Sequence, residues 1–112
     1  MRILLDECVP RKLKYSLPDQ ECQTVPEAGL SGKMNGTLLN LAESAGFEIF
    51  MTMDKGLEYE QNPAGRSIAI LILRAKSNRL ADLPPLVPGL LRIMNQARKD
   101  EIHRIRSGDP PS

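Results

Sequence analysis

The sequence predicts an α/β protein with a mostly parallel sheet of four or five strands. Short apolar segments that suit strands alternate along the chain with segments of helical periodicity, an order typical of parallel sheets. Ile3–Leu5 and Ile68–Leu73 are apolar at every position, as in central strands that are buried on both faces. A length of 112 residues predicts a single domain.

The first part of the chain predicts a strand, a short helix and a second strand. Ile3–Leu5 is the first strand. Pro10 suits the first turn of a helix over Arg11–Leu17, which ends at Pro18 because proline has no amide hydrogen to donate. Glu21–Val25 is less hydrophobic, so we expect a strand nearer the edge of the sheet.

The middle of the chain predicts a loop, a helix and a buried strand. Pro26–Lys33 contains two glycines and is expected to be a loop. Asn35 is a favourable N-cap for the next helix, and Gly46 is a typical stop at its C-terminus. Glu48–Met53 then forms the third strand.

Asp54 follows the third strand and is expected to cap a short helical turn over Lys55–Gln61. Asn62–Gly65 contains a proline and a glycine, which predicts a turn. Ser67–Leu73 is rich in isoleucine and leucine and is expected to be the fourth strand.

The last part predicts a helix and an edge strand. Asp82 is expected to cap the helix, which carries an apolar stripe and ends near Lys99. Ile102–Ile105 predicts a short strand at the other edge. We expect one domain over residues 1–106 and a disordered tail over residues 107–112.

Composition limits the classes of function. The net charge of +1 gives no global attraction to nucleic acid or anionic lipid, so nucleic-acid binding would need a local basic patch. With two phenylalanines, two tyrosines and no tryptophan, a platform for stacking bases is not expected. The longest apolar run, Ile68–Leu73, is far shorter than the ~20 residues that span a bilayer, so no membrane partner is expected.

The two cysteines indicate a reducing compartment. Cys8 and Cys22 lack the spacing of metal ligands, and the N-terminus lacks the pattern of a secretory signal. A lone pair of cysteines in such a chain is typical of reduced thiols, which predicts a cytoplasmic location. Cys8 stands close to two acids, which is expected to raise its pKa and make it a poor nucleophile.

Two carboxylates follow the ends of buried strands. Asp6 comes directly after Ile3–Leu5, and Asp54 comes directly after Met53. In open parallel sheets, ligands bind in the crevice outside the carboxyl ends of the strands. If the two strands are neighbours, Asp6 and Asp54 face each other there, and two carboxylates favour a divalent metal ion. Each aspartate can also be interpreted as the cap of the helix that follows it.

Two glutamates could add to this acidic site. Glu7 follows Asp6, but the alternation of side chains along a strand lets only one of the two point squarely into the crevice. Glu58 comes one helical turn after Asp54 and is the better candidate for a third carboxylate. For each glutamate, a solvated position on the surface is the simpler interpretation.

Neutral and basic side chains complete the candidate site. Thr52 lies on the same strand face as the aspartate that follows, so its hydroxyl could orient that aspartate, although threonine is also an ordinary strand residue. Asn35 could coordinate a metal or hold a water without adding charge. Arg11, Lys12 and Arg74 follow strand ends, where positive groups suit a phosphodiester backbone.

Two segments resemble a known family. Ile3–Pro10 reads ILLDECVP, and Thr52–Leu57 reads TMDKGL. Together they resemble the small PIN-like domain family, in which a start LLDEnlP is followed by a strand end T-x-D-x-x-[FL]. The helix from Asn35 to Gly46 and the strand that ends LILR at Arg74 also fit, so the resemblance covers about residues 1–73.

Resemblance to the PIN superfamily implies a three-layer α/β/α sandwich and a cluster of three or four acids that binds Mg²⁺ or Mn²⁺. It also implies metal-dependent endoribonuclease activity. In this pattern Asp6 matches the first acid and Asp54 the strand-end acid, whereas Asn35 stands where a middle acid is usual. Glu7 and Glu58 are the residues that could compensate for the missing charge.

The resemblance also implies partners. Many relatives are VapC-type toxins of bacterial toxin–antitoxin pairs. An RNA substrate would then lie along Arg11, Lys12 and Arg74, and one or two metal ions between Asp6, Asp54 and a third acid would activate water for phosphodiester hydrolysis. As a toxin, the protein would be expected to bind an antitoxin protein across the crevice and to form a homodimer.

Two other functions compete with a nuclease. A catalytically degenerate PIN-like module would bind RNA or a protein without cutting, and Asn35 in place of an acid favours it. A response-regulator receiver would use Asp54 as its phosphoacceptor. The residues after Asp54 are Lys-Gly-Leu rather than the Met-Pro typical of receivers, and a later strand-end Thr or Ser and a Lys-Pro pair are lacking.

Overall fold

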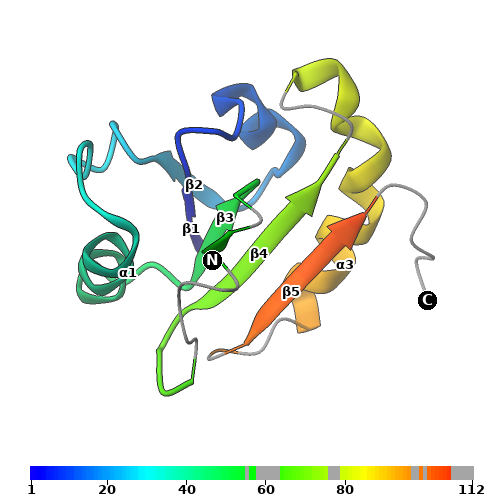
Figure 1. Ribbon diagram of the computed structural model, residues 1–112. Helices are drawn as coiled ribbons and strands as arrows, with labels where there is room; N and C mark the ends of the chain where they lie inside the picture. Colours follow the sequence, from blue (N-terminus) through cyan, green and yellow to red (C-terminus); the bar gives the residue numbers. More distant parts are fainter. Residues whose placement is uncertain (55, 58–63, 76–78, 97–98, 100, 107–112) are drawn as a thin grey trace.

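Five strands form one sheet in the order β2-β1-β3-β4-β5, and every neighbouring pair is parallel (Figure 1). This computed structural model describes residues 1–54, 56–57, 64–75, 79–96, 99 and 101–106, and of Asn35 only the backbone. The α/β class and the parallel sheet predicted from the sequence are confirmed.

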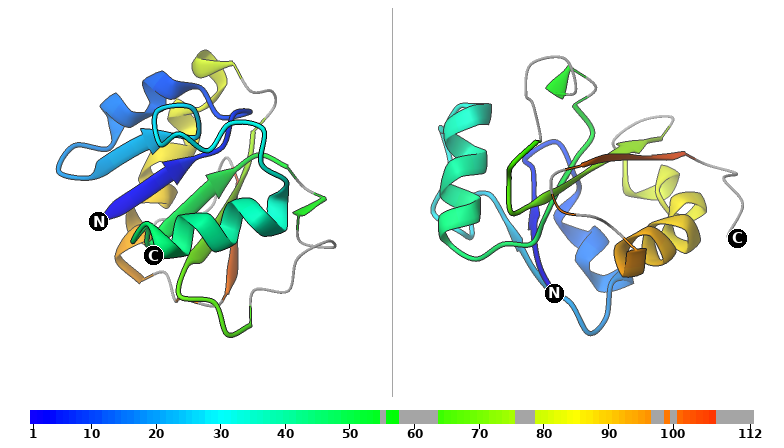
Figure 2. Two further views of the ribbon diagram at one scale, coloured as in Figure 1. Left: turned by 90° about the vertical axis from the view of Figure 1, so that its left-hand side faces the viewer. Right: turned by 90° about the horizontal axis from the view of Figure 1, so that it is seen from below.

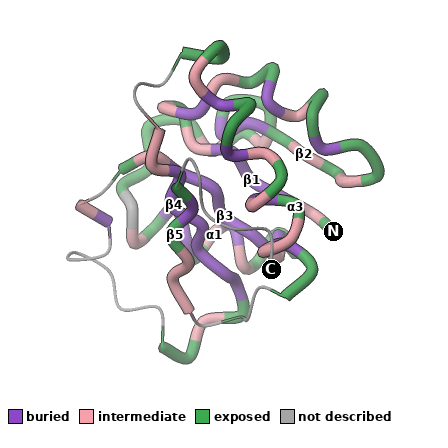
Figure 3. The backbone as a smooth tube through the Cα atoms, turned by 90° about the vertical axis from the view of Figure 1, so that its right-hand side faces the viewer, coloured by how far each residue is buried: buried purple, intermediate pink, exposed green. Residues whose placement is uncertain are grey.

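The strands lie close to their predicted positions. Their bounds are Arg2–Leu5 for β1, Glu21–Thr24 for β2, Ile49–Thr52 for β3, Ala69–Arg74 for β4 and Ile102–Arg106 for β5. The less hydrophobic β2 and β5 are at the two edges, as predicted, and the apolar β1, β3 and β4 are central. Figure 3 shows the central strands as buried stretches of the chain.

In the described part of the chain, two α-helices and three 3₁₀ helices lie between the strands. Their bounds are Arg11–Ser16 for η1, Asn35–Ser44 for α1, Leu80–Asp82 for η2, Pro84–Leu86 for η3 and Val87–Gln96 for α3. The expected helix after β1 therefore forms as a 3₁₀ helix, in which Leu13 is the buried residue. None of the helices in the described part of the chain combines the length and the apolar character that a membrane-spanning segment needs.

Two predicted helix caps are wrong. The N-cap of α1 is Met34, whose backbone is extended, and Asn35 is the first residue inside the helix. Asp82 ends η2 instead of capping α3. The reason is the Pro84–Pro85 pair, because neither proline has an amide hydrogen and each disfavours a helical conformation in the residue before it. The chain therefore takes two short 3₁₀ turns before α3 begins at Val87.

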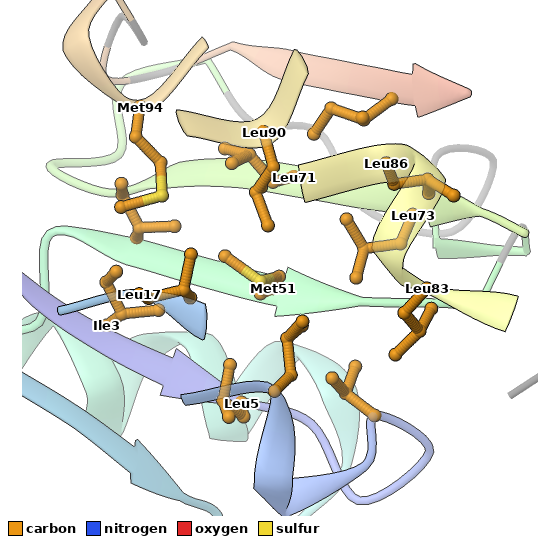
Figure 4. Close-up of a cluster of buried hydrophobic side chains, with 14 of the residues drawn as sticks. Ile3, Leu5, Leu17, Met51, Leu71, Leu73, Leu83, Leu86, Leu90 and Met94 are labelled. Atoms are coloured by element: carbon orange, nitrogen blue, oxygen red, sulfur yellow. The ribbon is translucent and has the colours of Figure 1, made fainter. Parts of the chain in front are cut away.

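Helices cover both faces of the sheet (Figure 2). On one face, strand residues such as Ile3, Met51 and Leu71 pack with residues of η1, η3 and α3 in a single buried cluster. Figure 4 shows this cluster between the strands and the C-terminal helices, with Met51, Leu71 and Leu90 among its labelled residues. On the other face, residues such as Leu4 and Phe50 pack with α1.

Arg2 fastens the amino end of the sheet. Its guanidinium donates to the carbonyl of Ala45, lies 4.5 Å from the ring centroid of Phe47, and has its Nε 3.5 Å from a carboxylate oxygen of Glu21. Gly46 permits this approach, because its φ of +87° suits glycine and an added Cβ would lie 3.0 Å from a guanidinium nitrogen of Arg2. One side chain thus joins β1 to β2 and to the end of α1.

The chain order creates a switch point at the other end. From β1 the chain moves outward to β2, and it then returns past β1 to form β3 on the other side. In parallel sheets of this order, the crevice at the carboxyl ends of the two strands that flank the switch is the usual ligand site. Here those strands are β1 and β3, which are followed by Asp6 and Asp54.

We predict that truncating a central core side chain destabilises the protein far more than truncating a surface one. Leu71→Ala removes a fully buried side chain of β4 and should lower the free energy of unfolding by about 2–5 kcal/mol. Leu91→Ala, at a residue of α3 that is 38% exposed, should cost less than about 1 kcal/mol. Urea unfolding of both variants measures the difference, and equal losses would contradict the described core.

Candidate functional site

Asp6 is held at the switch point by its backbone. Its amide donates to the carbonyl of Met51 at 2.9 Å, which continues the pairing of β1 with β3 by one residue. The side chain is half-buried. The carboxylate of Asp6 therefore starts from a fixed backbone position beside the end of β3.

The hydroxyl of Thr52 joins the two aspartates. Thr52 is the last residue of β3 and is fully buried. Its Oγ1 donates to Oδ2 of Asp6 at 2.7 Å and accepts from the backbone amide of Asp54 at 3.0 Å. The Thr52 hydroxyl thus orients the main chain of Asp54, whereas the carboxylate that it binds is that of Asp6. One hydroxyl therefore links the segments that follow β1 and β3.

Both carboxylate oxygens of Asp6 accept hydrogen bonds from within the protein. The amide of Glu7 donates to Oδ1 at 2.8 Å. The thiol of Cys8 lies 3.7 Å from Oδ2 and 3.6 Å from the hydroxyl of Thr52. The amide of Met53 in turn donates to the sulfur of Cys8 at 3.3 Å. These contacts fix the orientation of the Asp6 carboxylate and leave it half-exposed.

The surroundings of Cys8 raise the pKa of its thiol, as predicted. Burial is the main cause, because it disfavours the charged thiolate, and the negative charge of Asp6 adds to the effect. Hydrogen bonds from Met53 and Thr52 act in the opposite direction and are outweighed. The neighbouring acid is therefore a smaller cause than burial, and Cys8 is a protonated partner of the network at neutral pH.

Asp54 is exposed and begins a turn. Its Oδ1 accepts from the amide of Gly56 at 2.9 Å, and its carbonyl accepts from the amide of Leu57 at 3.3 Å. These bonds are those of a cap, as predicted for the start of this segment. The remainder of the expected helical turn, from residue 58 to residue 61, lies outside the described residues.

A cavity of about 790 Å³ lies beside Asp6, on the side toward β2. Residues 6–11 form one wall, Lys14 and Tyr15 of η1 another, and residues after β2 and Leu80 complete it. Asp6 and Glu7 both line this cavity, because β1 ends at Leu5 and the turn that follows is not bound by the alternation of a strand.

The segment after β2 is anchored to η1 at this cavity. The amide of Thr24 donates to Glu27 at 2.9 Å, the amide of Glu27 donates to the hydroxyl of Thr24 at 3.2 Å, and Lys14 lies 3.2 Å from Glu27. The Thr24 amide is the main cause that lowers the pKa of Glu27, followed by Lys14. This cluster was not predicted from the sequence, although Thr24-x-x-Glu27 has the spacing of a capping box.

The predicted basic residues are not gathered in one place. Arg11 is exposed and lines the cavity. Lys12 is exposed but is not part of the cavity wall, and Arg74 is half-buried at the end of β4, beyond β3. Of the three, the structure brings only Arg11 to the cavity beside Asp6.

Two further residues of the predicted site, Glu58 and the side chain of Asn35, are not described. Glu58 lies outside the described residues, and the described part of Asn35 is its backbone at the start of α1. Within the described portion of the chain, no three or more histidine, cysteine or acidic side chains form a group that could hold a metal ion. Of the predicted acids, the structure describes Asp6, Glu7 and Asp54, all at the carboxyl ends of β1 and β3.

No family model, curated protein or solved structure matches the chain.

We predict that the Thr52 hydroxyl contributes to stability through both of its hydrogen bonds. Thr52→Val keeps the shape of the side chain but removes both the buried donor to Asp6 and the acceptor for the Asp54 amide, so it should cost about 1–3 kcal/mol. The same change at exposed Thr37 on α1 should cost no more than about 0.5 kcal/mol. Urea unfolding at pH 7 compares them, and a Thr52→Val protein as stable as Thr37→Val would refute the bridging role.

We predict slow alkylation of Cys8 and a loss of stability at alkaline pH. Burial raises the pKa of this thiol in the folded protein above that of the unfolded chain, so the unfolded chain loses the proton first as pH rises. The stabilisation is complete below the unfolded pKa and is lost as pH rises through the folded one. In a Cys22→Ser variant, Cys8 is the thiol that iodoacetamide alkylates. The rate of this alkylation in the folded variant should rise at a higher pH than in the same variant unfolded in urea. Coincident profiles would contradict the prediction.

Proposed function

We propose that this protein is a Mg²⁺- or Mn²⁺-dependent endoribonuclease of PIN-like, three-layer architecture, with its site at the carboxyl ends of β1 and β3. The observation that carries the proposal is the Thr52 hydroxyl, which links Asp6 to the segment of Asp54 at the switch point of the sheet. The two motifs that resemble the PIN-like family are thereby joined by one buried group. Helices on both faces of the sheet agree with the proposed layering.

The donors at this site suit Mg²⁺ or Mn²⁺. Asp6 and Asp54 offer carboxylate oxygens, which are the ligands that these ions prefer. Mg²⁺ usually keeps several waters and binds proteins through one or two carboxylates together with phosphates of the substrate. Asp6 and Asp54 would hold such an ion together with phosphate oxygens of the RNA, even with Asn35 in place of a middle acid. When bound, the ion would supply Lewis acidity and an activated water.

The chain's own residues would position the metal ligands and the RNA. The bonds from Glu7, Thr52 and Cys8 fix the carboxylate of Asp6, which reduces the reorganisation needed when a substrate arrives. Arg11, exposed on the cavity wall, would contact a phosphate beside the site. Other roles remain predictions from the sequence. They are RNA contacts by Lys12 and Arg74, a third carboxylate from Glu58, binding of an antitoxin, and formation of a homodimer.

A module that binds RNA without cutting is the second candidate. The observation that favours it is that the described acids near the switch point do not form a group of three. With Asn35 at the start of α1, a third carboxylate would have to come from Glu7 or Glu58. Such a module would keep the arrangement of Asp6 and Thr52 for stability and would not need a metal.

The strand order alone does not separate a nuclease from a response-regulator receiver, because receivers share it. The residues at the later strand ends separate them. β4 ends at Leu73-Arg74 and β5 ends at Ile105-Arg106, whereas a receiver places a Thr or Ser and a Lys at these ends. Asp54 as a phosphoacceptor would lack both partners, so the receiver is the weaker interpretation.

We predict that RNA cleavage depends on both aspartates and on a divalent ion. Asp6→Asn and Asp54→Asn should each reduce the rate of cleavage of labelled single-stranded RNA in Mn²⁺ by about 100-fold or more, since each removes a charge from the metal site. Chelation by EDTA should abolish cleavage by the unaltered protein. Asp19→Asn is the matched control, because Asp19 is exposed near the opposite end of the sheet and its φ of 70° is well tolerated by asparagine.

Titration calorimetry with Mn²⁺ distinguishes the two candidates. Binding that is lost in Asp6→Asn and Asp54→Asn and retained in Asp19→Asn supports the nuclease. RNA binding without Mn²⁺ binding at millimolar concentration identifies the module. Undiminished cleavage by both aspartate variants would reject the proposed site.

A further inference from the structure

The cavity beside Asp6 has a size and a lining that the acidic site alone does not explain. Its volume of about 790 Å³ falls within the roughly 300–1,000 Å³ of pockets that hold small ligands. It lies toward β2, while Asp54, beyond β3, takes no part in its lining. The cavity is therefore a compartment that shares Asp6 with the proposed metal site and extends away from it.

Two large apolar side chains on the cavity wall are exposed. Tyr15 of η1 is 77% exposed, and Leu80 at the start of η2 is 40% exposed. The Lys14 ammonium lies over the Tyr15 ring, 5.9 Å from its centroid, and the rest of this exposed ring is a suitable surface for a flat ring, because any nucleobase can stack on it. Tyr15 comes from η1 and Leu80 from the segment after β4, so the fold brings these two surfaces to one place.

The charges on the wall favour a ligand that is neutral in part. Asp6, Glu7 and Glu27 outnumber Arg11 and Lys14, and the Lys14 ammonium lies 3.2 Å from Glu27. A ligand that is anionic throughout would meet more repulsion than attraction here. A nucleotide fits better, because its base is neutral and its phosphate can be met by Arg11.

We propose that this cavity accepts one unstacked nucleotide of a single-stranded RNA, with its base against Tyr15 and its phosphate toward Arg11. Double-stranded RNA would be excluded, because a paired base cannot leave its stack without cost. The position of this nucleotide next to the cleaved bond rests on the proposed function, because Asp6 belongs to both compartments. Binding of the base does not require the metal.

Fluorescence anisotropy in EDTA tests the base contact. The protein carries Asp54→Asn, which prevents cleavage and alters no residue of the cavity wall. The probe is a labelled single strand of about ten nucleotides without self-complementarity, a length within the usual range of single-strand sites. Adding Tyr15→Ala should weaken binding about tenfold, Tyr15→Phe should retain affinity, and Leu91→Ala, an exposed site on α3 outside the cavity, should change nothing.

A strand of the same length with abasic sugars separates base from backbone. It carries the same phosphates but no bases, so the Asp54→Asn protein should bind it about tenfold more weakly than RNA. Adding Tyr15→Ala should cause no further loss of affinity for the abasic strand. The RNA duplex of the same sequence should also bind more weakly than the single strand. Unchanged affinity in Tyr15→Ala, an equal loss on the abasic strand, or no binding of the single strand would overturn the proposal.

The outcomes for the two proposals are distinct. If metal-dependent cleavage requires Asp6 and Asp54 but Tyr15→Ala does not change RNA binding, the nucleotide cavity is refuted and the nuclease is retained. Tyr15-dependent binding of the single strand, with cleavage that survives Asp6→Asn and Asp54→Asn, retains the cavity and refutes the metal site.

Discussion

The arrangement of the candidate site depends on a single buried hydroxyl. Thr52 is the last residue of β3, which borders the point where the strand order reverses. Its hydroxyl donates to Asp6 and accepts from the amide of Asp54. In surroundings from which water is excluded, such bonds are strong and unsatisfied groups are costly. The segments after β1 and β3 are thus held together by the same group that brings their aspartates to one edge of the sheet.

The central part of the fold could be read from the sequence because burial on both faces leaves a simple pattern. Ile3–Leu5 and Ile68–Leu73 are uninterrupted apolar runs, and both lie in central strands. The helix boundaries were less accessible. Asn35 is a strong cap by propensity, yet the extended residue before α1 is Met34, and Asn35 is already the first residue of the helix. The start of α3 depends on two adjacent prolines.

The site was predictable where it depends on position along a strand and unpredictable where it depends on tertiary contacts. Asp6 and Asp54 follow strand ends, and parallel strands carry such residues to a common edge. Tyr15 and Glu27 belong to segments whose placement on the cavity wall is set by how η1 and the turn after β2 pack together. No local pattern reports that packing, although the Thr24–Glu27 spacing is that of a capping box.

The attachment of Arg2 at the amino end of the sheet has a consequence for motion in this molecule. Its contacts with Ala45, Phe47 and Glu21 tie together β1, β2 and the end of α1, at the edge opposite Asp6. These contacts restrain β1, β2 and the end of α1 from shifting relative to one another at the amino end of the sheet.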